Sequence, residues 1–143
     1  MGIAYIKVPP EEAIKILDEC IVEGYQVKDK INQEYYSDKS GAEGKIGNWQ
    51  QVSIDWTNNC LKKLGDVFVS LKELFNFRDA RPPFGATSEN VHFIGIIDHI
   101  KARIDRLNEY DRYIRDEFNV KVEVVGRDKI IQQGDNPKVE IKN

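Results

Sequence analysis

Residues 48–76 read NWQQVSIDWTNNCLKKLGDVFVSLKELFN and carry the clearest periodic pattern in the chain. Apolar side chains recur at spacings of three and four from Trp49 through Trp56 to Leu74. Such spacing places them on one face of an α-helix, so the segment predicts a helix about 40 Å long at 1.5 Å per residue. Gly65 is the weakest helix former within it.

A helix is also predicted upstream, at residues 10–36. Prolines and glutamates open this segment, and both suit a first turn, where a missing N–H costs nothing and the helix dipole favours negative charge. Gly24 weakens its middle by about 1 kcal/mol relative to alanine and is the candidate position for a kink. Residues 37–47 hold three glycines and two serines, which predicts a flexible loop. The apolar face of the helix comprises Ile14, Leu17, Ile21 and Tyr25.

A third helix is predicted at residues 89–119, after a proline-containing loop at residues 76–87 that cannot be helical throughout. Its apolar residues form a heptad seam, as in a coiled coil, with Asp111 as the one interruption. Two long helices joined by such a loop are expected to pack antiparallel at a shallow angle. The seam comprises Phe93, Ile97, Ile100, Ile104, Leu107, Ile114 and Phe118.

The ends of the chain follow a different period. Valines alternate with charged residues after position 119, which predicts a β-like tail at residues 120–142, and residues 3–8 are a candidate additional strand. We therefore predict one domain over residues 1–143. Its fold class is mainly α: an elongated antiparallel three-helix bundle with a short β-strand or hairpin appendage.

Composition excludes several classes of function. Lysine plus arginine count 21 against 24 aspartates plus glutamates, and this balance argues against nucleic-acid binding. No apolar run approaches the roughly 20 residues of a membrane span, so no membrane association is expected. The start of the chain lacks the pattern of a signal peptide, which favours a cytoplasmic location.

No catalytic residue, metal site or cofactor is predicted. Walker, dinucleotide-binding and nucleophile-elbow motifs do not occur, so the sequence favours a protein that is not an enzyme. Glu89 and His92 have the spacing used in di-iron bundles, but such sites need a second copy of the pair. Cys20 and Cys60 fall on apolar helix faces, where a structural role is expected.

Two surfaces are candidates for binding. One flank of the third helix could hold an anionic ligand such as a nucleotide, or could simply be a solvated helix shoulder. The residues of this flank are His99, Arg103, Arg106 and Tyr110. The proline-containing loop could contact a protein partner, or could be a rigid connector. Its contact residues would be Arg78, Arg81, Pro82, Pro83 and Phe84.

Aromatic residues exceed what a three-helix core needs, which favours burial in a homo-oligomer or against a protein partner. The surplus comprises Tyr35, Tyr36, Phe68, Phe75, Phe77 and Phe84. Trp49 and Trp56 are expected in the core rather than in a stacking platform. The leading function is thus a non-enzymatic interaction module, and the alternative is a small-ligand binding protein.

Residues 12–118 resemble the helical region that precedes TIR-like or other nucleotide-sensing effector domains in bacterial anti-phage defence proteins. The resemblance is carried by Leu17-x3-Ile21-x2-Gly24-Tyr25, by Trp49-x6-Trp56 and by the apolar residues from Leu61 to Phe68. It implies an association or sensing module. No TIR-like α/β domain follows within the 143 residues, so no catalytic residue carries over.

Overall fold

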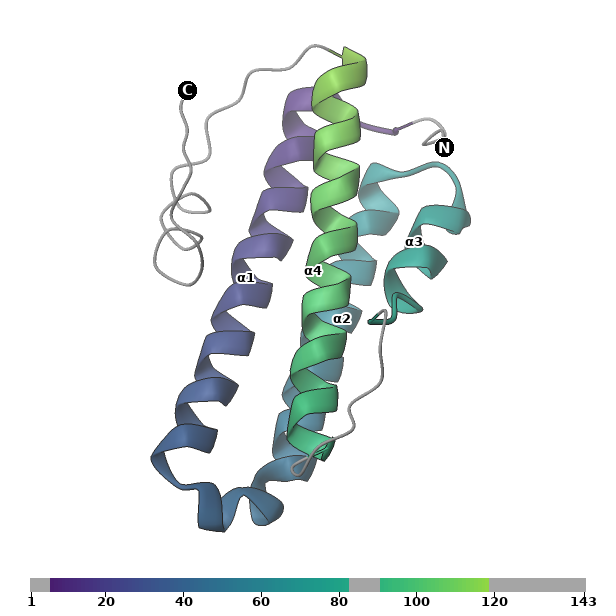
Figure 1. The fold of residues 1–143 in the computed structure, drawn as a ribbon. Coiled ribbons are helices and arrows are strands. Elements are labelled where there is room, and N and C mark those ends of the chain that lie inside the picture. The colour runs from purple at the N-terminus through teal and green to yellow at the C-terminus, as the bar shows by residue number, and fades with distance from the viewer. Residues whose placement is uncertain (1–5, 83–90, 119–143) are drawn as a thin grey trace, which may run out of the picture.

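The computed structural model describes residues 6–82 and 91–118, and this part of the chain is mainly helical, as predicted (Figure 1). It contains four α-helices rather than three, together with a short 3-10 helix. In chain order they are α1 (Pro10–Ser37), η1 (Lys39–Lys45), α2 (Ile46–Val67), α3 (Leu71–Arg78) and α4 (Val91–Phe118).

Aromatic contacts define the directions of the three long helices. Tyr35, near the end of α1, stacks on Phe93 at the start of α4, with ring centroids 3.8 Å apart. Trp49, at the start of α2, also meets Phe93, with centroids 5.7 Å apart. At the other end, Phe68 and Tyr110 lie 5.3 Å apart. Hence α1 is antiparallel to α4, whereas α2 and α4 run in the same direction (Figure 1).

The prediction of a single helix at residues 48–76 is wrong. The predicted antiparallel packing of this segment against the helix at residues 89–119 is wrong as well. Helix α2 ends at Val67, Phe68 is extended (φ −104°, ψ 139°), and Ser70 caps α3 by accepting a hydrogen bond from the Lys72 N–H at 3.0 Å. The Lys7 N–H donates to the Val67 carbonyl at 2.6 Å. That bond satisfies an acceptor that the end of a helix otherwise leaves to water. Helix α3 then runs back, so α4 can follow the direction of α2.

The core lies among the three long helices and the inner face of α3. Trp49 and Trp56 are buried in it, as predicted. The aromatic surplus is smaller than expected, because Phe68 and the inner face of α3 complete the core: Tyr35, Phe68 and Phe77 are buried. Tyr36 and Phe75 are exposed by 64% and 45%, and Phe84 lies outside the described residues.

The predicted β-like elements lie mostly outside the described residues. The tail at residues 120–142 lies outside the described part of the chain. Of the candidate strand at residues 3–8, Ile6 forms an isolated antiparallel bridge with Phe68. Helix α1 is continuous through Gly24. No helix among the described residues is long and apolar enough to cross a membrane.

Helix α3 is short, and this determines where the surface is hollowed. Its eight residues span about 12 Å, whereas the 22 residues of α2 span about 33 Å. Phe77, near the end of α3, meets Trp56 in the middle of α2, with ring centroids 5.9 Å apart. Thus α3 covers only one half of the α2–α4 pair (Figure 1).

Candidate functional site

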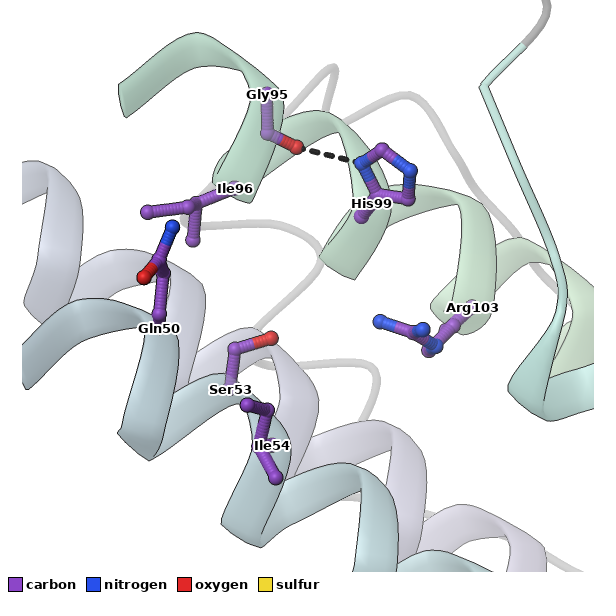
Figure 2. Close-up of a pocket in the computed structure, with 7 residues that line it drawn as sticks. All are labelled: Gln50, Ser53, Ile54, Gly95, Ile96, His99 and Arg103. Carbon is purple, nitrogen blue, oxygen red and sulfur yellow. Dashed lines mark hydrogen bonds between the residues drawn. The ribbon is translucent and has the colours of Figure 1, made fainter. Parts of the chain in front are cut away.

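An open groove of about 440 Å³ lies between α2 and α4, directly beyond the C-terminal end of α3 (Figure 2). It occupies the position that α3 would fill if it continued along the bundle. Two isoleucines, one from each helix, provide its large apolar side chains, and polar groups surround them. The described residues that line it are Gln50, Ser53, Ile54, Gly95, Ile96, His99 and Arg103.

His99 lines this groove and contacts the preceding turn of its own helix. Its Nδ1 atom lies 2.8 Å from the Gly95 carbonyl oxygen, one turn earlier in α4 (Figure 2). Because a carbonyl oxygen only accepts hydrogen bonds, we assign the proton of the neutral ring to Nδ1. The Nε2 atom is then an acceptor for a hydroxyl, amide or amine group.

Arg103 joins the groove to the end of α3. Its Nε and Nη2 atoms both donate to the Arg78 carbonyl oxygen, at 3.1 and 2.8 Å. These bonds satisfy one of the carbonyls that the end of a helix leaves without a helical partner. Burial lowers the pKa of Arg103, and the charge of Asp79 partly offsets this effect. The guanidinium stays protonated, because arginine is not deprotonated in proteins.

The four residues of the predicted anionic-ligand flank do not meet in one site. His99 and Arg103 line the groove, but Arg106 forms an ion pair with Glu109 at 3.5 Å. The Tyr110 hydroxyl donates to the Glu73 carbonyl at 2.8 Å, and only 1% of this residue is exposed. Burial raises the pKa of Tyr110 to about 12. Tyr110 therefore belongs to the packing of α3 on α4.

The predicted partner-contact loop is partly described. Arg78 and Arg81 are exposed at the end of α3, Pro82 is half-buried, and residues 83–84 lie outside the described part. Arg78 is held within its own helix end, because it pairs with Asp79 at 2.9 Å. This side-chain hydrogen bond raises the pKa of Arg78 and lowers that of its partner.

Neither cysteine is positioned as a nucleophile. Cys20 and Cys60 are free thiols, both fully buried. A hydrogen bond with the Cys20 thiol, together with burial, raises the pKa of Cys60. Since the thiolate is the reactive form, these surroundings oppose reactivity. Within the described residues, no cluster of three or more histidine, cysteine, aspartate or glutamate side chains could hold a metal ion.

Gly95 lies on the wall of the groove, and alanine at this position should stabilise the protein. A Cβ atom built there meets nothing within 4 Å. The new methyl group fits, and alanine in a helix interior is favoured over glycine. We expect Gly95→Ala to raise the free energy of unfolding by about 0.5–1 kcal/mol. Urea denaturation checks this expectation, and an unchanged or lower stability would contradict it.

Sequence patterns anticipated only His99 and Arg103 among the residues that line the groove. Ile54 and Ile96 fall beside the predicted apolar stripes and carry no signal of their own, because the groove exists only where α3 ends. Comparisons with protein-family models, with curated proteins and with solved structures find no match for this chain.

Proposed function

We propose that this protein is a non-enzymatic helical interaction module, which binds a protein partner or a second copy of itself along the groove. One observation carries the proposal: α3 fills only half of the fourth-helix position beside α2 and α4. A helix supplied from outside would complete the bundle there. Helices that lay an apolar face into a hydrophobic groove are a common mode of recognition.

The exposed isoleucine of α2 supports this proposal. Half of Ile54 is exposed, although aliphatic side chains of this size are usually buried. Ile96, from α4, lines the same groove and lies beside Gln50 (Figure 2). A helix with aliphatic residues on one face would cover both side chains and remove this apolar area from water.

The alternative, a binding site for a small anion such as a nucleotide, has weaker support. A nucleotide phosphate is normally held by several cations or backbone N–H groups that converge on it. Here Arg103 is the one cationic residue among the described residues that line the groove, and two of its donors already bind the Arg78 carbonyl. We therefore favour a protein ligand.

A role in bacterial or phage defence is a further part of the proposal, and the resemblance described above is its support. Two motif residues do depend on each other in the fold. A Cβ atom on Gly24 would lie 2.5 Å from Cζ2 of Trp56, so this glycine makes room for the tryptophan.

Selection of displayed peptides against the full chain tests the interaction module. From a library of amphipathic helices we expect binders whose affinity falls about tenfold or more in the variant Ile54→Asp, because a carboxylate would then replace an apolar contact. Fluorescence anisotropy measures the affinities. Val69→Asp is the matched control, since Val69 is an equally exposed apolar residue (56%) outside the groove.

Sedimentation velocity over a range of protein concentrations decides whether the partner is a second copy. A dimer that is lost in Ile54→Asp but kept in Val69→Asp would show self-association through the groove. A library that yields no binders, combined with a monomer at every concentration, would contradict the proposed function.

A further inference from the structure

The groove lies in line with α3, and this restricts the shape of its occupant. The Arg78 carbonyl, at the end of α3, is held by Arg103, which lies near the middle of α4. The part of α4 before Arg103 has twelve described residues, Val91 to Ala102, which span about 18 Å. This stretch of α4 beyond the end of α3 is therefore as long as a helix of about three turns, which would lie over the groove.

The charge of the groove restricts the chemistry of that helix. None of the described residues that line the groove carries a carboxylate. Arg103 uses two N–H groups on Arg78, and among the described residues no further acceptor meets its guanidinium. Burial lowers its pKa more than the charge of Asp79 raises it, so the charged form is incompletely compensated, and a carboxylate from a ligand would improve its surroundings. Carboxylates form charge-assisted, often bidentate bonds with arginine.

A second copy of this chain fits the groove less well than a different protein. The exposed apolar helix that the described part of the chain could offer is α3, with Leu71 exposed by 61%. The exposed basic residues of that helix are Lys72 and Arg78, whereas its one glutamate is buried. Because Arg78 is paired with Asp79, docking α3 of one copy into another would bring Lys72 and no exposed glutamate towards Arg103, and like charges at an interface are unfavourable.

The direction of the bound helix follows from the helix dipole. The C-terminal end of α3 carries partial negative charge and faces the groove, so the positive N-terminal end of a bound helix is favoured next to it. Carboxylates in the first turn of a helix are themselves stabilised by that dipole. A helix that follows α3 in the same direction thus places its first turn beside Arg103, whose positive charge offsets the repulsion between the end of α3 and a carboxylate in that turn.

We infer that the partner in the groove is an amphipathic helix from another protein, with a carboxylate in its first turn that pairs with Arg103 and an aliphatic face that covers Ile54 and Ile96. This inference rests on the proposed function, since it names the partner of the same groove. Arg103 then has two roles: it holds the end of α3 and selects an acidic ligand.

Three stapled helical peptides of about three turns test the inference. They share leucines on one face and differ at one first-turn position, which is Glu, Gln or Lys. For the full wild-type chain we expect the Glu peptide to bind about tenfold more tightly than the Gln peptide, and the Lys peptide to bind most weakly. In Arg103→Met the Glu and Gln peptides should bind with equal affinity, and Arg103→Lys should restore part of the preference.

The outcomes separate the inference from the proposed function. If all three peptides bind equally and Ile54→Asp abolishes binding, the groove binds helices but the acidic preference is wrong. If the Lys peptide binds best, the inference is also overturned. If no peptide binds and the displayed library yields no binder, both proposals fall. Arg103→Met removes both hydrogen bonds to the Arg78 carbonyl, so a thermal melt is recorded for every variant, and Arg103→Lys keeps the comparison valid if Arg103→Met unfolds.

Discussion

Replacing Gly24 with alanine is expected to destabilise the protein by about 2 kcal/mol, because the new methyl group overpacks the core. The added Cβ atom would lie 2.5 Å from Cζ2 of Trp56 and 2.9 Å from Cγ1 of Ile104. Real Cβ atoms essentially never approach other atoms so closely. Three helices meet at this point, so the backbones of α1, α2 and α4 or their side chains must shift.

Neither neighbour of Gly24 can move freely. The indole Nε1 of Trp56 donates to the Cys20 carbonyl at 3.0 Å, and the edge of the ring packs against Phe77. Ile104 is buried in the same core, with an exposed fraction of 2%. Helix propensity alone predicts the opposite result, a gain of up to about 1 kcal/mol, so the sign of the change is informative.

Urea denaturation of Gly24→Ala and Gly95→Ala provides the comparison. Both variants make the same chemical change in the interior of a long helix, and we expect opposite signs. Trp56→Phe removes part of the crowding ring, so the double variant with Gly24→Ala should lose less stability than the sum of the two single variants. If Gly24→Ala is as stable as the wild type, the close packing of α1 on Trp56 is wrong.

Helix α3 shows what apolar periodicity alone did not reveal about the fold, although Ser70-x-x-Glu73 has the capping-box spacing of a helix start. Three non-helical residues, Phe68 to Ser70, separate it from α2. Leu71 and Leu74 nevertheless stay in phase with the apolar stripe of α2, so periodicity predicts one continuous helix. The break depends on a distant residue, because the Lys7 N–H bonds the Val67 carbonyl. The periodicity of a segment does not indicate a hydrogen bond from a residue so far away in the sequence. The ends of α1, in contrast, were predictable from its prolines and from the loop that follows.

The candidate site shows the same limit. The four residues of the predicted flank do lie on one helix, α4. However, α3 covers one part of this flank and leaves the other part open. Tyr110 is therefore buried under α3, while His99 faces the groove. A helical wheel cannot distinguish the two residues, because the difference depends on where a neighbouring helix ends. Gly24 is a second example: the sequence indicates a weak point, and the structure shows close packing.

Replacing Arg115 with methionine is expected to destabilise the protein by about 3 kcal/mol, since breaking a buried ion pair leaves charge in a poorly solvated site. The Arg115 Nε atom donates to Oδ1 of Asp111 at 2.6 Å, and its Nη2 atom lies 3.4 Å from Oδ2 of Asp18 on α1. Both carboxylates are buried, with side chains exposed by 1% and 5%. The interruption of the heptad seam at Asp111 is thus part of an ionic contact that links α4 to α1.

Urea denaturation at neutral pH measures the loss, and Arg112→Met is the matched control. Arg112 is exposed on the same helix, so its replacement should change stability by no more than about 0.5 kcal/mol. The triple variant Asp18→Asn, Asp111→Asn and Arg115→Met removes all three charges and should recover most of the loss, because neutral groups are much less costly to bury. A loss below about 1 kcal/mol in Arg115→Met would show that the two carboxylates do not depend on this guanidinium.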